Sequence, residues 1–216
     1  MERDTDTILK IRREAFREFM EKGYTNASLR SICKEAGVTT GALYFFFKDK
    51  DELFSSLVKE MVEEIYVMMM QHYSLECEME DSGFQAALEG ELEDTEDEKV
   101  IRNVIHVLYQ NREKALLLLT KAQGSSMEDV LDRFAQASEV QYRNMAARMK
   151  KLYPGREISP YVPNWFAHDQ IEGIVYAITH IDREEEALVF VGNLAAYLRG
   201  GWKAIWAEAG DKGSSP

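Results

Sequence analysis

"GVTTGALYFFFKDK", residues 37–50, sets a tyrosine and three phenylalanines in consecutive positions and brackets them with polar residues. Gly37 is typical of a helix end, because a glycine readily adopts the left-handed backbone found there. Thr39 or Thr40 can cap the short helix that follows, which we expect to run through Phe47. A stretch this short and this aromatic requires a reason beyond core packing.

The four rings separate into two groups on a helical wheel that advances about 100° per residue. Leu43, Phe47 and, at the margin, Phe46 share the side that packs against the rest of the protein. Tyr44 and Phe45 point outward beside a glycine. Two exposed rings next to a residue without a side chain indicate a surface that meets a partner.

The preceding residues predict two further helices. Apolar residues recur at three- and four-residue steps from Asp4 to Lys22, and Gly23 ends that pattern. Ser28 is a good N-cap for a short helix that stops at Gly37. A helix, a tight turn and a second short helix form the helix-turn-helix arrangement, which places its second helix in the major groove of DNA. A long helix follows, with Asp49 as its N-cap and Glu52 as the reciprocal partner.

The chemistry of the short helix suits a DNA backbone. Hydroxyl groups at its start and the Tyr44 hydroxyl can bind phosphate, and Gly41 allows close approach. Phe45 has no hydrogen-bonding group, so it can read only shape or a thymine methyl. Two lysines follow for the flanking backbone. The predicted DNA-binding residues are Ser28, Thr39, Thr40, Gly41, Tyr44, Phe45, Lys48 and Lys50.

The composition fits an ordinary folded chain of 216 residues, 45% hydrophobic and 30% charged, with a net charge of -12. Residues 1–50 hold ten Lys and Arg against eight Asp and Glu, a net of +2, so the remainder carries -14. This asymmetry leaves a small basic domain free to approach phosphate. Two distant cysteines, a charged N-terminus and the absence of any long apolar run predict a cytoplasmic protein that has no membrane partner.

The rest of the chain is predicted to be helical, which makes the fold class all-α. Helical patterns span residues 100–119 with one break, 127–152, 164–181 and 184–209, whereas the acidic stretch 74–98 reads as a loosely helical connection. Residues 171–181 and 188–205 are apolar on more than one side, which suggests a helix-on-helix dimer interface. We expect a helix-turn-helix domain at 1–50, a ligand-binding and dimerisation domain at 51–209 and a frayed tail at 210–216.

Residues 5–62 resemble the DNA-binding domain of the TetR (tetracycline-repressor-like) transcriptional regulators. The matching elements, in order and at family spacing, are "AFREF", "KGY", "SLRSI", "AGV", "GALYFFF" and "KDKDEL". Phe46 and Cys33 depart from the family's usual histidine and alanine. The resemblance implies a three-helix DNA-binding domain joined by a long helix to a helical body, and a homodimeric repressor on a near-palindromic operator, released by a small-molecule effector.

The effector pocket is predicted from chemistry alone. A Met-rich stretch "VMMMQHY" at 67–73 and several aromatic residues can either pack the core or line a cavity between helices. The acidic body favours a hydrophobic effector that is neutral or cationic. The pocket candidates are Met69, His106, Tyr109, Trp165 and Tyr176.

An enzymatic alternative rests on the dipeptide His168-Asp169. Together with His106 and Asp182 it could imitate a metal-dependent phosphohydrolase of the HD type. The sequence holds no HExxH, Gly-rich phosphate loop, GxSxG or CxxC pattern. We therefore predict no catalytic residue, no metal and no cofactor.

Overall fold

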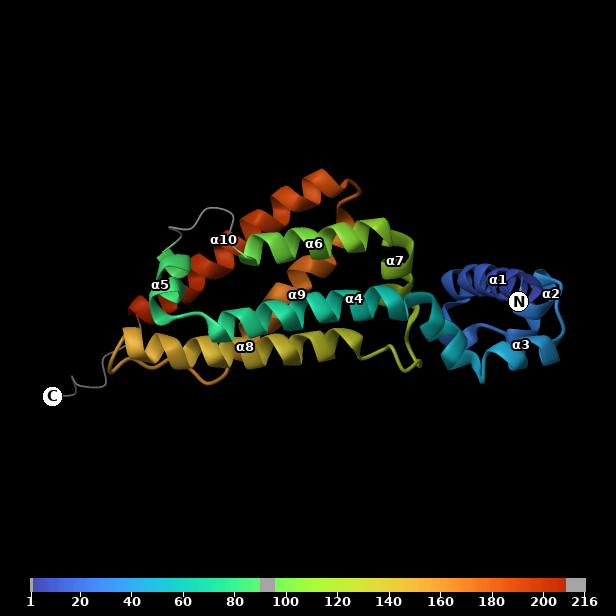
Figure 1. Ribbon diagram of the computed structural model, residues 1–216, viewed down its shortest axis with the longest axis horizontal. Helices are drawn as coiled ribbons and strands as arrows, with labels where there is room; N and C mark the ends of the chain where they lie inside the picture. The colour runs from blue at the N-terminus through green and yellow to red at the C-terminus, as the bar shows by residue number, and fades with distance from the viewer. Residues whose placement is uncertain (1, 90–95, 209–216) are drawn as a thin grey trace. The chain divides into compact units, whose positions relative to one another are not determined.

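The computed structural model describes residues 2–89 and 96–208, and these residues form ten helices and no strand (Figure 1). The prediction of an all-α fold is confirmed. The helices are α1 (Glu2–Asn26), α2 (Leu29–Ala36), α3 (Thr40–Phe46), α4 (Lys50–Glu78), α5 (Asp81–Glu89), α6 (Glu96–Gln110), α7 (Arg112–Lys121), α8 (Val130–Leu152), α9 (Val162–His180) and α10 (Glu184–Glu208).

The chain divides into two compact units. Unit 1 comprises the residues up to Glu64 together with Gln110–Val130, and unit 2 comprises Ile65–Tyr109 and the residues from Leu131 onward. The helix α4 begins in unit 1 and ends in unit 2. Segment 110–130, which contains α7, therefore packs with the N-terminal helices although it lies far along the sequence. The domain boundary at residue 50 stays a prediction.

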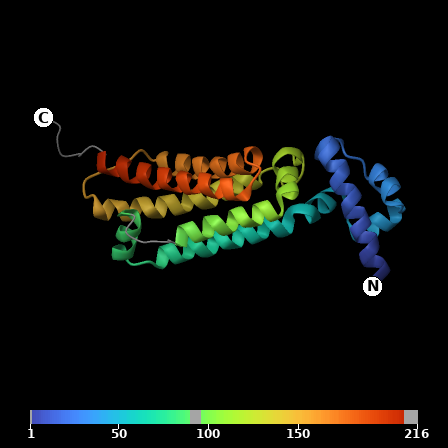
Figure 2. The same cartoon turned by 90° about the horizontal axis from the view of Figure 1, so that it is seen from above.

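Unit 1 is built on a core that the first helices share. Ile11 and Phe19 of α1, Ile32 of α2 and Leu43 of α3 are almost fully buried, as is Phe54 at the start of α4. The rings of Phe19 and Phe54 meet edge to face, with centroids 5.1 Å apart. Figure 2 shows α1, α2 and α3 from a second side. This core fixes which face of α3 remains outside.

The predicted helix ends at Ser28, Gly37 and Asp49 are confirmed, whereas Gly23 kinks α1 and the helix continues to Asn26. Gly23 interrupts α1 with φ 73°, and Gly37 ends α2 with φ 67°. The amide of Ser31 donates to the Ser28 hydroxyl oxygen at 3.4 Å. At the start of α4 the amide of Glu52 donates to Asp49 at 2.9 Å. The Glu52 carboxylate reaches one residue further back than expected, because it accepts from the amide of Lys48 rather than that of Asp49.

Unit 2 is a bundle in which α4 and α8 run side by side (Figures 1 and 2). Polar groups join these two helices: the hydroxyls of Tyr73 and Ser138 lie 2.8 Å apart, and Arg148 donates to the carbonyls of Glu76 and Met79. Apolar residues fill the end of the bundle that holds α5 and the last turns of α8 and α10. This cluster is formed by Phe84, Leu88, Met149, Phe166, Leu198, Trp202 and Trp206.

The helical patterns predicted for the second half of the chain are confirmed, with small shifts of their ends. The break inside residues 100–119 lies at Asn111, between α6 and α7. The stretch 74–98 is more regular than expected, since α4 continues to Glu78 and α5 follows directly. Residues 90–95 of that stretch and the tail 210–216 lie outside the described residues. None of the helices described is long and apolar enough to cross a membrane.

Candidate nucleic-acid interface

The short helix α3 turns one face into the core and the other to solvent, as the helical wheel predicts. Leu43 and Phe47 are buried, and Phe46 is half-buried. Tyr44 is 56% exposed and Phe45 is 79% exposed. The core side chains hold α3 in place, so its outward surface is fixed relative to the rest of unit 1.

The exposed ring of Phe45 does not hang free in solvent. It meets the ring of Phe46 edge to face, with centroids 5.0 Å apart and an interplanar angle of 84°. Edge-to-face pairs of this kind are favourable beyond the area they bury. The half-buried Phe46 therefore orients the exposed Phe45. Because the Phe45 ring is already ordered, less side-chain entropy is lost when a partner binds to it.

Hydroxyl groups and a bare backbone surround the two rings. The Thr39 oxygen accepts a hydrogen bond from the amide of Ala42 at 3.1 Å, which caps α3 and leaves the hydroxyl hydrogen to donate outward. Thr40 and Gly41 are exposed. A methyl group added at Gly41 would meet only the Thr39 hydroxyl, at 3.8 Å, so the surface here is open.

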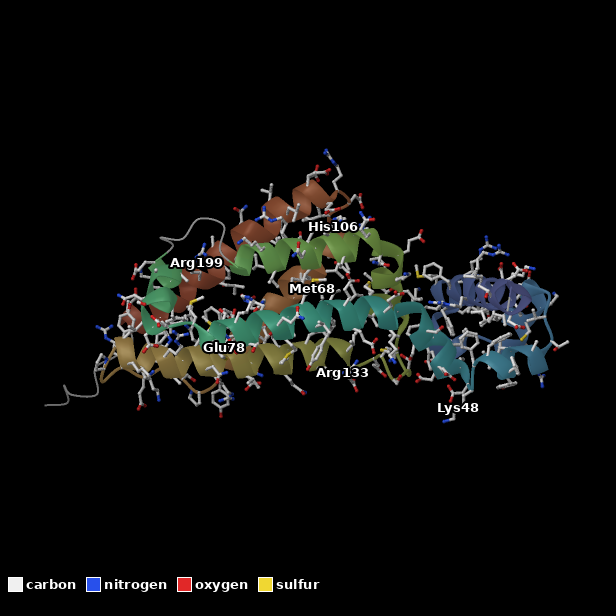
Figure 3. The ribbon with its side chains drawn as sticks, in the orientation of Figure 1. Lys48, Met68, Glu78, His106, Arg133 and Arg199 are labelled. Carbon is white, nitrogen blue, oxygen red and sulfur yellow. The ribbon has the colours of Figure 1, made fainter. Side chains whose placement is uncertain are left out.

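The two lysines after α3 lie in different environments. Lys48 is exposed, and its side chain extends away from the helices (Figure 3). The Lys50 ammonium instead donates to the carbonyls of Tyr24 at 2.8 Å and Thr25 at 3.1 Å, and it lies over the Tyr24 ring. Lys48 is therefore available to a phosphate, whereas Lys50 ties the end of α1 to the start of α4.

A buried carboxylate holds α2 against α1. Glu18 is only 7% exposed and accepts hydrogen bonds from Lys22, from the amide of Ser28 and from the hydroxyl of Ser31. Burial by itself raises the pKa of Glu18, but these hydrogen bonds and the Lys22 charge outweigh it, so the pKa lies below its usual value. Sequence reasoning missed this role, although a glutamate among the apolar positions of α1 was its signal.

A distant segment completes unit 1. The amide of Ser126 donates to the carboxylate of Asp51 at 2.7 Å, and the Thr25 hydroxyl donates to the carbonyl of Gln123 at 2.8 Å. The loop after α7 thus fastens both the end of α1 and the start of α4. No sequence signal pointed to these contacts, because the partners are many tens of residues apart.

A family model described as "Bacterial regulatory proteins, tetR family" matches residues 11–57. Residues 11–57 therefore resemble the DNA-binding domain of that family. The match spans α2, α3 and the interface described above, together with most of α1 and the start of α4. The resemblance read from the sequence is therefore confirmed.

Known transcriptional regulators are similar to this chain over short segments. The HTH-type transcriptional regulator AcrR of Shigella flexneri is 51% identical over 43 residues, which is 20% of this chain and 20% of that protein. The HTH-type transcriptional regulator PksA of Bacillus subtilis is 38% identical over 56 residues, 26% of this chain and 27% of its own length. The matched segments thus span only about a fifth to a quarter of these relatives.

Solved structures share the fold of this chain over most of its length. A putative TetR-family regulator from Syntrophomonas wolfei superposes with a TM-score of 0.54 at 19% identity, covering 94% of this chain and 96% of its own. A gamma-butyrolactone receptor described as ArpA-like gives a TM-score of 0.55 at 16% identity, covering 95% and 96%. At these identities the likeness concerns the fold alone.

The five predicted pocket residues lie in different environments. Met69 is buried beside Ser138, and the Tyr109 hydroxyl donates to the carbonyl of Ile181 at 2.8 Å. His106 is exposed and lies 2.9 Å from the carboxylate of Glu184 (Figure 3). Trp165 and Tyr176 are about half exposed. That these five residues share one ligand pocket stays a prediction.

The helices α9 and α10 expose several large apolar side chains. Trp165, Tyr176, Val189 and Tyr197 are exposed on them. An open groove of about 510 Å³ lies between the two helices, lined by Asp169, Glu172, Gly173, Val175, Tyr176, Thr179, His180, Phe190 and Leu194. These are the helices in which the sequence shows apolar residues on more than one side.

The residues of the enzymatic alternative are not assembled into a metal centre. Within residues 2–89 and 96–208 no group of three or more His, Cys, Asp or Glu side chains could hold a metal ion. His168 is exposed, and His106 pairs with Glu184 instead. The arrangement that an HD-type phosphohydrolase needs is therefore missing from the described part of the chain.

Proposed function

We propose that this protein is a TetR-family transcriptional regulator, a repressor, that binds a near-palindromic DNA operator as a homodimer and is released by a small-molecule effector. The observation that carries the proposal is the outward pair Tyr44 and Phe45 beside Gly41, on the second helix of a helix-turn-helix. Monomeric proteins rarely expose large rings together unless a partner covers them.

Binding follows from the chemistry of this surface. With α3 in the major groove, the hydroxyls of Thr39, Thr40 and Tyr44 donate to phosphate oxygens, and Lys48 adds a mobile positive charge. Residues 1–50 carry a net charge of +2 against -14 for the remainder, so the polyanion is drawn to this end of the chain.

The exposed face of α9 and α10 supports the homodimer. A four-helix contact between two copies would bury Tyr176, Val189 and Tyr197, and the same patch would serve both partners about a two-fold axis. Two DNA-binding domains related in this way read half-sites about 34 Å apart, one helical turn of DNA. Near-palindromic operators follow from that symmetry.

Release requires an effector with different affinities for the two states of the protein. Shifting the population from roughly 99:1 to 1:99 takes about 5.5 kcal/mol of differential binding. The acidic body, residues 51–216 with net charge -14, favours a hydrophobic effector that is neutral or cationic. We expect it to bind among the helices of unit 2.

Duplex binding is tested by selection and titration. The full-length protein is used to enrich duplexes from a randomised pool, and the enriched duplex is titrated by fluorescence anisotropy at several salt concentrations. We expect sequence-selective binding that weakens steeply with salt and falls at least tenfold in Tyr44→Ala. Tyr161→Ala is the control, because Tyr161 is a tyrosine that is exposed, to 80%, outside the interface. Failure to enrich any sequence contradicts the proposal.

A further inference from the structure

The helix α3 and the residues directly beside it lack the side chains that commonly distinguish bases by hydrogen bonds. Residues 38–47, which contain α3, include no Arg, Lys, Asn, Gln, Asp or Glu. Arginine and lysine read guanine, Asn and Gln read adenine, and the acids read cytosine in the major groove. The exposed part of α3 offers hydroxyl groups and one large apolar ring instead. Base readout by this helix therefore has to use other contacts.

Phe45 is the side chain that remains for such a contact. It is 79% exposed, more than Leu9 and Tyr44, the other exposed large apolar residues described in unit 1. Its edge-to-face contact with Phe46 fixes the direction of the ring. An ordered apolar ring gains nothing from a phosphate, since it would remove water from the charge without offering a hydrogen bond in return.

The thymine 5-methyl is the apolar group that base pairs present in the major groove. We propose that Phe45 is a specificity-determining residue that packs against a thymine methyl in each operator half-site. This inference rests on the DNA-binding function proposed above and adds the operator feature that α3 reads. The operator then requires a T·A pair at the position that faces Phe45, and the methyl itself, not the hydrogen-bonding edge, is what is recognised.

Deoxyuridine isolates the methyl group, because it lacks only that group and keeps the hydrogen-bonding edge of thymine. The duplex enriched by the wild-type protein is resynthesised with each thymine replaced singly by deoxyuridine, and each duplex is titrated. We expect one position in each half-site at which the replacement weakens binding about fourfold, the equivalent of one buried methyl. Replacement in both half-sites together should weaken binding roughly fifteenfold.

Variants assign the effect to the residue. In Phe45→Ala the thymine and deoxyuridine duplexes should bind equally, whereas Phe45→Leu should keep part of the difference. Leu9→Ala, at an exposed apolar residue of α1, should keep all of it. An enriched duplex that tolerates deoxyuridine at every position overturns the methyl contact and leaves DNA binding standing. A preference that persists in Phe45→Ala also overturns it. A pool that yields no duplex overturns both proposals.

Discussion

Asp51, in the first turn of α4, accepts a hydrogen bond from the backbone amide of Ser126, 75 positions further along the chain. The Ser55 and Ser126 hydroxyls lie 3.4 Å apart beside it, and Thr25 bonds the neighbouring carbonyl of Gln123. The loop between α7 and α8 is thus held by the same residues that end α1 and begin α4. Unit 1 consequently depends on a segment that the family match does not include.

Replacing Asp51 with alanine should loosen that loop. Losing one exposed, charge-assisted hydrogen bond costs about 1 kcal/mol, which corresponds to roughly fivefold faster amide exchange in residues 122–130. Hydrogen–deuterium exchange measures this directly. All three tryptophans lie in unit 2, so their fluorescence reports that unit separately and should not change. Asp51→Asn keeps an acceptor and should show a smaller effect; equal exchange in wild type and Asp51→Ala would rule out the contact.

Lys48 and Lys50 should respond differently to the same substitution. Lys48→Ala removes a free charge, so it should weaken duplex binding and lower the salt-dependence slope by about one, without affecting the fold. Lys50→Ala removes the bonds to the carbonyls of Tyr24 and Thr25, so it should mainly speed amide exchange at the end of α1. Salt titrations and exchange on both variants distinguish the two roles. A slope that falls more in Lys50→Ala would reverse the assignment.

Glu18 should make the stability of unit 1 depend on acid. The pKa of Glu18 in the folded protein is lowered from its usual value of 4.5. The stability that ionised Glu18 adds is therefore fully present above pH 4.5, and it is lost as the pH falls through the pKa of the folded state. Glu18→Gln should destabilise α2 by about 1.5–3 kcal/mol at neutral pH, since the bonds to a charged acceptor are weakened. The difference between wild type and variant should shrink on acidification.

Amide exchange of α2 measured between neutral pH and about pH 3.5 checks the Glu18 prediction. Glu21→Gln is the control, because Glu21 lies on the exposed side of α1, the helix that carries Glu18, and this variant should behave like the wild type. A difference between wild type and Glu18→Gln that stays constant over this range would show that the carboxylate charge contributes nothing.

Charges placed on the apolar face of α9 and α10 should separate the proposed dimer. Val189→Asp combined with Tyr197→Asp puts carboxylates where the two copies would meet, and sedimentation velocity should then give a species near 24.9 kDa. Binding to a palindromic duplex should fall at least tenfold. Val140→Asp changes an exposed valine of α8 and should leave the mass unchanged. A wild type that sediments as a monomer at the concentrations of the DNA titration would exclude this dimer.

Local rules sufficed for the elements whose ends are set within a few residues. Ser28 and Gly37 begin and end α2 as predicted, because backbone preference and capping act over one turn. The outward direction of Tyr44 and Phe45 followed from the helical period. The different environments of Lys48 and Lys50 could not be predicted from the helical period, because the carbonyls that bind Lys50 come from the end of another helix. The contacts of Asp51 and Glu18 likewise depend on tertiary packing, which periodicity cannot report.

The polar seam between α4 and α8 sets how unit 2 can rearrange. Tyr73 with Ser138, Glu76 with Gln141 and Arg148 with two carbonyls form a ladder that has one register. Sliding one helix by part of a turn would break these hydrogen bonds together. The next position at which the same groups could pair again lies a full turn away. We therefore expect α4 and α8 to move together as one rigid body. A ligand that acts on them should then shift their position in an all-or-none way instead of a graded one.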